Sequence, residues 1–146
     1  RNLVIDSTCY FEGGSYVAAF AISNGGTIEN CRNYAQVRSL GSYAAGFATT
    51  NSGKIVNCLN AGDIFSNTTH AAGFASTNFG DLYRVANVGN VTARNLATVY
   101  RAATPAATYA GGIVGYNNGY AVFIVGESDI IGSFLYRFLS IAHGYS

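Results

Sequence analysis

An internal repeat with a period of about 27 residues constrains the fold of this chain more than any other feature. Asn24, Asn51 and Asn78 are equally spaced, and the residues around them recur with the same spacing. Periods of about 20 to 50 residues are typical of solenoids and propellers, in which each repeat buries its apolar face only against its neighbours. The coils run over residues 16–42, 43–69, 70–92 and 109–135, with an insertion at 93–108 and a partial fifth coil at 136–146. We expect residues 1–146 to form one solenoid segment of a longer protein.

Apolar residues recur once per coil in three columns rather than at helical spacing. The columns are Phe20/Phe47/Phe74/Ile113, Ile28/Ile55/Leu82/Ala121 and Val37/Ile64/Val91/Ile130. Each lies in a short run of β-branched or aromatic residues bounded by Gly or Asn. This pattern predicts three strands per coil, near residues 17–23, 27–32 and 35–39 of the first. Ile28 and Cys31 are three apart and cannot both face inward by strict alternation, so either the chain bends near Asn30 or one column is misassigned.

The coil length and the three-strand unit favour an all-β fold, a right-handed parallel β-helix in which each strand stacks on its counterpart in the next coil. A propeller is the runner-up. It needs four strands per repeat and usually about 40 or more residues, which the shorter period of this chain does not supply.

Asparagines mark the corners and flank the core columns. The corner motifs are Asn-Gly-Gly at 24–26, Asn-Ser-Gly at 51–53, Asn-Phe-Gly at 78–80 and Asn-Asn-Gly at 117–119. Asn and Gly tolerate a left-handed backbone, which we expect at these tight corners. Stacked Asn amides can also hydrogen-bond from coil to coil. The predicted ladder columns are Asn24/Asn51/Asn78/Asn117 and Asn33/Asn60/Asn87, with Asn30/Asn57 beside the core as well.

The three cysteines cannot all pair within one chain. Cys31 and Cys58 share a repeat position, whereas Cys9 lies outside that column. Stacked coils would set Cys31 and Cys58 about 4.8 Å apart at the backbone, which permits a disulfide without requiring one. Val85 and Ile124 continue the column, so we interpret it as a buried ladder of free thiols and aliphatic side chains, with a 31–58 bridge as the alternative.

The repeat also resembles a known family. The pattern G-G/F-x-x-x-N-x-G-x-I-x-N-C-x-N-x-G-x-I, which residues 45–64 present as AGFATTNSGKIVNCLNAGDI, is similar to the GLUG-type repeats of bacterial surface and secreted proteins. The similarity covers residues 16–91 and 111–119, and Phe123 and Ile124 replace Asn-Cys in the last unit. The resemblance implies a β-solenoid stalk or adhesive region outside the cell. It does not imply catalysis, because the residues used by peptidases that carry such repeats are missing here.

Composition argues against several classes of partner and cofactor. Charged residues make up 10% of the chain and its net charge is +1, against about 25% charged residues in an average globular protein. We therefore expect no nucleic-acid binding and no membrane insertion. His70 and His143 lie in no metal-binding motif, and the cysteines lack C-x-x-C spacing, so we expect no metal and no cofactor. His70 replaces Tyr43 at the start of a coil and is interpreted as a surface or corner residue.

The insertion is the candidate recognition site, because loops that leave a rigid scaffold often carry binding residues. It contains Arg94, Tyr100 and Arg101, which could contact a glycan or a protein, or could equally cover the seam of the solenoid.

Two further patterns define alternative functions. Asp63 and Asp129 occupy equivalent positions two coils apart, about 9.5 Å by strand spacing, which is within the range of an inverting glycosidase. Both also stand where a solvated polar residue is expected, and we predict no enzymatic activity. A hydroxyl column, which a flat ice-binding face would need, consists of Ser23, Thr50, Thr77 and Tyr116, with Thr49 and Ser76 beside it.

We therefore predict a non-catalytic extracellular or cell-surface module that acts as a stalk, adhesin or fibre-forming repeat. Its expected partners are neighbouring coils or copies of itself end to end, and a host glycan or protein. The alternatives are an ice-binding β-helix and a β-helix that binds or cleaves polysaccharide.

Overall fold

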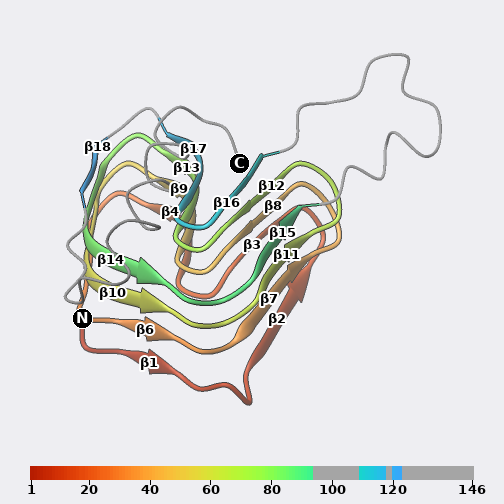
Figure 1. Ribbon diagram of the computed structural model, residues 1–146, viewed down its shortest axis with the longest axis horizontal. Helices are drawn as coiled ribbons and strands as arrows, with labels where there is room; N and C mark the ends of the chain where they lie inside the picture. The colour runs from red at the N-terminus through yellow and green to blue at the C-terminus, as the bar shows by residue number, and fades with distance from the viewer. Residues whose placement is uncertain (94–108, 118–119, 123–146) are drawn as a thin grey trace.

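The protein is a β-solenoid, as the sequence predicts. The computed structural model describes residues 1–93, 109–117 and 120–122, and over these residues it contains strands and no helix. Each strand pairs in parallel with its counterpart one coil away, so that the coils lie one upon another (Figure 1). In the second and third coils the paired residues are one repeat period apart, as in the pairing of Ile55 with Leu82. The parallel stacking thus places equivalent residues of these coils next to each other.

Four parallel sheets wrap the stack, and we name them A to D. Sheet A contains β1 (Val4–Ile5), β5 (Thr27–Glu29), β6 (Arg32–Asn33), β10 (Lys54–Asn60), β14 (Asp81–Asn87) and β18 (Tyr120–Val122). Sheet B contains β2 (Tyr10–Gly13), β7 (Gln36–Ser39), β11 (Ile64–Ser66) and β15 (Val91–Ala93). Sheet C contains β3 (Tyr16–Ala18), β8 (Tyr43–Ala45), β12 (His70–Ala72) and β16 (Tyr109–Gly111). Sheet D contains β4 (Ala21–Asn24), β9 (Ala48–Asn51), β13 (Ala75–Asn78) and β17 (Val114–Asn117).

The prediction of three strands per coil is wrong in one respect, because the first expected strand is two strands in different sheets. In the second coil the break falls at Gly46 and Phe47, between β8 and β9. A Cβ on Gly46 would strike the carbonyl oxygen of Gly73 in the next coil and the side chain of Asn60 across the coil. Glycine therefore lets the chain turn there against the opposite wall, which divides the coil interior.

The division produces two hydrophobic clusters. One lies between sheets A and D and centres on Phe47, Phe74, Ile55 and Leu82. The other lies between sheets B and C and includes Val37, Ile64 and Ala71 among others. The three predicted apolar columns thus face the interior, two of them in the first cluster and one in the second.

The phenylalanine column is a continuous ring stack. The rings of Phe20 and Phe47 are 4.5 Å apart between centroids, and those of Phe47 and Phe74 are 4.6 Å apart. Ile113 continues the column in the fourth coil and is buried. Ile130, predicted in another column, lies outside the described residues.

The chain bends at Asn30, which resolves the spacing conflict between Ile28 and Cys31. Asn30 has a φ of 54°, Asn57 a φ of 52° and Arg84 a φ of 52°. One left-handed residue resets the alternation, so the side chains before and after it both point inward. Asn30 and Asn57 are exposed and form this bend rather than a buried ladder. Asn is favoured there because it visits the left-handed region more readily than most residues.

The Asn-x-Gly corners at 24–26, 51–53 and 78–80 do not have the left-handed backbone that the sequence predicted. Neither Asn51 nor Gly53 has a φ in the left-handed region. Glycine is needed at position 53 for space, because a Cβ there would collide with the carbonyl oxygen of Gly26 in the preceding coil. Asn51 instead turns its side chain into the interior, where it is fully buried.

The pairing offset changes between the third coil and the fourth. His70 pairs with Tyr109 and Thr77 with Tyr116, so the step from the third coil to the fourth is longer than the repeat period. The register of sheets C and D therefore continues across the insertion.

Candidate functional site

Two columns of asparagine side chains, all buried except the half-buried Asn87, run along the axis at the positions predicted for the ladders. In the first, the Nδ2 group of Asn24 donates to Oδ1 of Asn51, and that of Asn51 to Oδ1 of Asn78, each at 2.7 Å. In the second, Asn33 donates to Asn60 and Asn60 to Asn87, also at 2.7 Å. All four of these bonds point the same way along the axis.

The same amides also satisfy the turns. Nδ2 of Asn60 donates to the carbonyl oxygen of Gly62 at 2.9 Å. Oδ1 of Asn33 accepts the backbone N–H of Ala35 at 3.1 Å. Each interior amide therefore links its own turn to the neighbouring coil, which accounts for a polar side chain in a dry core. Asn117 pairs in register with Asn78, so the first column extends to the fourth coil at the level of the backbone.

The predicted cysteine column is buried and its thiols are free. Cys31 and Cys58 are both buried, whereas Cys9 is exposed. Sγ of Cys31 donates to the carbonyl oxygen of Glu29 at 3.2 Å, and Sγ of Cys58 to that of Val56 at 3.1 Å. Burial raises the pKa of the Cys58 thiol to about 11. The structure thus has the free-thiol arrangement that we preferred over the 31–58 bridge.

The predicted recognition residues Arg94, Tyr100 and Arg101 lie outside the described residues, as does Asp129. The structure therefore tests neither the recognition loop nor a carboxylate pair.

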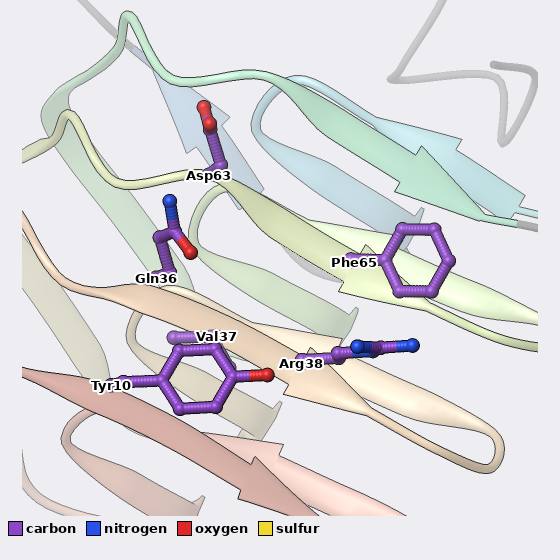
Figure 2. Close-up of a pocket in the computed structure, with 6 residues that line it drawn as sticks. All are labelled: Tyr10, Gln36, Val37, Arg38, Asp63 and Phe65. Atoms are coloured by element: carbon purple, nitrogen blue, oxygen red, sulfur yellow. The ribbon is translucent and has the colours of Figure 1, made fainter.

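The outer face of sheet B carries a different set of chemically active side chains. Along β7 the odd positions are buried and the even positions exposed, so Gln36 and Arg38 point outward on either side of Val37. These two side chains line an open pocket (Figure 2). The neighbouring strands add Tyr10 from β2 and Phe65 from β11, and Asp63, which directly precedes β11, completes the lining. We call these five outward side chains, Tyr10, Gln36, Arg38, Asp63 and Phe65, the sheet B site.

Contacts across coils fix the geometry of the sheet B site. The Tyr10 hydroxyl donates to Oε2 of Glu12 at 2.6 Å, and this carboxylate lies 3.7 Å from Nη1 of Arg38. The Arg38 guanidinium lies over the Phe65 ring, 5.4 Å from its centroid. The bond to Glu12 raises the pKa of Tyr10, so its hydroxyl stays protonated at neutral pH.

Asp63 is held by the next coil. Its Oδ1 accepts both the backbone N–H of Asn90 at 3.0 Å and the Nδ2 group of Asn90 at 3.1 Å. Asp63 is exposed and stands at the upper edge of the pocket in Figure 2. One carboxylate oxygen is therefore occupied by a structural contact, and the other remains for a ligand.

The hydroxyl column forms in the predicted register, but its flanking residues are not on the surface. Ser23 pairs with Thr50, and Thr50 with Thr77. Thr49 and Ser76 are buried. Their hydroxyls donate to the carbonyl oxygens of Ile22 and Ala44, at 2.6 and 2.8 Å. On this face of the described coils, the hydroxyls that reach the surface thus form a single column rather than a broad face.

His70 continues an aromatic stack on sheet C. The rings of Tyr16 and Tyr43 lie 4.7 Å apart, and those of Tyr43 and His70 lie 4.5 Å apart. Nδ1 of His70 lies 2.8 Å from Oγ1 of Thr69. Burial lowers the pKa of His70. The residue is half-buried and has the structural position that its replacement of Tyr43 predicted.

The N-terminal end of the stack is an open surface. The outermost strands β2, β3 and β4 each pair on one side only within the described residues. Leu3, Val4 and Ile22 are each about half exposed there, at 51%, 58% and 50%. A Cβ on Gly26 would meet nothing within 4 Å, in contrast to Gly53 in the same column. Unpaired strand edges of this kind are templates for a further strand.

The sheet B site is the feature that the sequence reasoning missed. Its signal was present, since the residues flanking the inward Val37 and Ile64 must point outward in a strand. The column analysis followed residues that recur, whereas Gln36 and Asp63, or Arg38 and Phe65, differ between coils.

No group of three His, Cys, Asp or Glu side chains arranged for a metal ion occurs in the part of the chain that the structure describes. That part also holds no helix with the length and apolarity needed to cross a bilayer. Comparison with family profiles, with curated proteins and with solved structures finds no match.

Proposed function

We propose that this chain is a non-catalytic structural and adhesive module of an extracellular or cell-surface protein, a rigid stalk or fibre-forming repeat that carries a recognition surface. The observation that supports it most is the pair of asparagine ladders, which connect the first three coils by hydrogen bonds of 2.7 Å, three of them buried and the fourth part-buried. A stack joined in this way along its interior resists bending and twisting between coils. Such stiffness is the property that a stalk needs.

The open N-terminal end supports end-to-end association. Asn24 and Asn33 are the first members of their ladders, and each uses its Nδ2 group to donate toward the second coil. A coil added at this end would follow the same rule by donating to Oδ1 of Asn24, whereas Ile5 of β1 already pairs with Asn33 on that side. Gly26 leaves the space that the carbonyl oxygen of such a coil would occupy. The partner we propose is therefore another coil of the same type, from a copy of this chain or a neighbouring repeat.

The ice-binding alternative is weaker than the sequence indicated. A flat ice-binding face would need neighbouring columns of exposed hydroxyls, and the Thr49/Ser76 column is buried and bonded to the main chain. The polysaccharide-cleaving alternative is weakened by Asp63, since Asn90 occupies one of its carboxylate oxygens with two hydrogen bonds.

Electron microscopy of the purified chain at several concentrations tests the proposal. We expect straight particles of fixed cross-section, whose length grows with concentration if the open end stacks. Gly26→Tyr should then stop growth, because it fills the space left for the next coil. Ser52→Tyr is the matched control, since Ser52 is an exposed corner residue of the second coil. Bent or irregular particles would contradict the structural module.

A further inference from the structure

The five side chains of the sheet B site combine two aromatic rings with a mixed set of hydrogen-bonding groups. Tyr10 is 52% exposed and Phe65 is only partly buried, although sheet B has an apolar interior side that could hold such rings. Both rings are seen face-on in Figure 2, with Gln36 and Arg38 on the strand between them. The site therefore offers flat apolar surfaces beside polar groups.

The spacing of the rings follows from the solenoid. Tyr10 pairs with Gln36 in β7, and Phe65 pairs with Arg38 in the same strand, so the two aromatic residues stand two coils apart. At about 4.8 Å per coil their backbones are separated by about 9.6 Å along the axis. A ligand that contacts both rings must be a chain of at least two ring-sized units. It would cross the strands obliquely to the axis, because Gln36 and Arg38, the partners of the two rings, stand two residues apart along β7.

The polar groups beside the rings, of which Gln36 and Arg38 lie on the strand between them, both donate and accept. Gln36 provides a carbonyl oxygen and an amide, Arg38 donates only, and Asp63 accepts only. The charges of Glu12, Arg38 and Asp63 sum to one negative charge, which disfavours an anionic ligand. Sugar hydroxyls are both donors and acceptors, and the C–H faces of a sugar ring pack on aromatic faces. A neutral saccharide matches each of these properties.

We propose that the sheet B site binds a neutral oligosaccharide, with Tyr10 and Phe65 as the stacking residues and Gln36, Arg38 and Asp63 as the hydroxyl-binding residues. This inference rests on the proposed adhesive function and names its ligand class. The coil register that holds Arg38 over Phe65 also fixes the two stacking rings before the ligand arrives, which lowers the entropy lost on binding.

Isothermal titration calorimetry of the full chain with cellohexaose, chitohexaose, maltohexaose and xylohexaose tests the proposal. We expect saturable binding of at least one of these sugars. Tyr10→Ala and Phe65→Ala should each raise its Kd roughly tenfold. Arg38→Ala should weaken binding as well, because it removes a donor and the contact that orients Phe65.

Tyr83→Ala is the matched control. Arg84 lies over the Tyr83 ring at 5.3 Å on the outer side of sheet A, so this pair copies the Arg38–Phe65 contact away from the pocket. Tyr83→Ala should leave the Kd unchanged. Circular dichroism should show that every variant keeps its β-sheet signal.

Three results would overturn the proposal: no binding of any of the four sugars, equal loss of affinity in Tyr83→Ala, or binding of polygalacturonate in place of the neutral sugars. None of them bears on the particle shape that electron microscopy would measure. Failure of the saccharide site is therefore distinguishable from failure of the structural module.

Discussion

The interior of the solenoid and the outer face of sheet B follow opposite rules. Inside, the same side chain recurs from coil to coil, as in the ladder formed by Asn33, Asn60 and Asn87. Outside, the side chain changes at each coil, so that Arg38 is followed by Phe65 in the same register. The interior and the outward side chains belong to the same strands and therefore have the same coil-to-coil spacing.

The difference teaches how a parallel stack divides its residues between stability and recognition. Register places each residue against its own counterpart, and a buried polar group must find its partner there because water is excluded. Asparagine meets this condition since one amide supplies both donor and acceptor. Outside, water satisfies the polar groups, so the residues can vary and create a site. Repetition in the core and variation on the surface are thus two consequences of the same geometry.

Breaking the ladder at its centre should have the largest effect. Asn60→Leu removes the partner of Asn33 Nδ2, of Asn87 Oδ1 and of the Gly62 carbonyl oxygen, all in the interior of the stack. At about 1 to 3 kcal/mol for each of these three groups, we expect a loss of at least about 3 kcal/mol in the free energy of unfolding. Urea denaturation followed by circular dichroism measures it.

Gln36→Leu is the control for this prediction, because it makes a similar change on the exposed face of the stack. It should alter the free energy of unfolding by less than about 0.5 kcal/mol. Equal urea midpoints for Asn60→Leu and Gln36→Leu would show that the ladder contributes nothing beyond ordinary packing.

Gly53→Ala tests whether glycine is required at the corner wherever a neighbouring coil lies against it. The added Cβ would collide with the Gly26 carbonyl oxygen of the preceding coil, and overpacking of this kind costs about 1 to 3 kcal/mol. Gly26→Ala, in the same column at the open end, meets nothing within 4 Å and should be neutral or slightly stabilising. Thermal unfolding of the two variants makes the comparison, and equal losses would refute a role for coil contact.

Arg84 breaks a repeated position, so restoring the repeat should stabilise the protein. Its φ of 52° is easily reached by the Asn residues at the same bend in the other coils, but not by arginine. Arg84→Asn should gain about 1 kcal/mol. Arg84→Lys, which changes the side chain without relieving the backbone, should show no gain in urea denaturation. A gain of the same size for the lysine variant would mean that backbone strain is not its cause.

His70 takes the place of a tyrosine in the aromatic stack on sheet C. It should make the free energy of unfolding depend on pH. Burial lowers the pKa of the folded state below the unfolded value of about 6.5. The unfolded chain therefore binds a proton first as pH falls, and stability decreases from about pH 6.5 downward until the folded pKa is passed. Urea midpoints at pH 7.5 and 5.5 should differ more for the wild type than for His70→Tyr. The same difference in both proteins would exclude His70 as the titrating group.

Labelling of the cysteine thiols should have the smallest effect on stability, because in the native protein the reagent reaches no interior side chain. Native protein should take up one equivalent of iodoacetamide, at the exposed Cys9, since Cys31 and Cys58 are buried. Unfolding without a reductant should raise the uptake to three equivalents in the intact-protein mass spectrum. An uptake that stays at one would establish the Cys31–Cys58 bridge instead.

Sequence reasoning recovered whatever the repeat itself encodes. The coil length, the apolar columns and the ladder residues follow from similar residues at equal spacing, whereas the bend at Asn30 was one of two alternatives that the spacing of Ile28 and Cys31 left open. The split between β8 and β9 did not, because Gly46 acts through a contact with Asn60 across the coil that periodicity does not reveal. The sheet B site was also missed. Its members come from different coils and do not resemble one another, so a search for recurring residues passes over them although the repeat period places them side by side.

The constant separation of pairing residues has a consequence for how the chain folds. A coil that docks on a formed neighbour closes a loop of one repeat period, as when Lys54 meets Asp81, and the entropy of that closure depends on loop length rather than on the number of coils. Folding can then advance as a zipper, one coil at a time, although every pairing is distant in sequence. The loop that the pairing of His70 with Tyr109 closes is longer than one repeat period by less than half of that period. This adds only about 0.3 kcal/mol to the entropic cost of loop closure. The longer loop at the insertion should therefore slow the docking of the fourth coil only slightly.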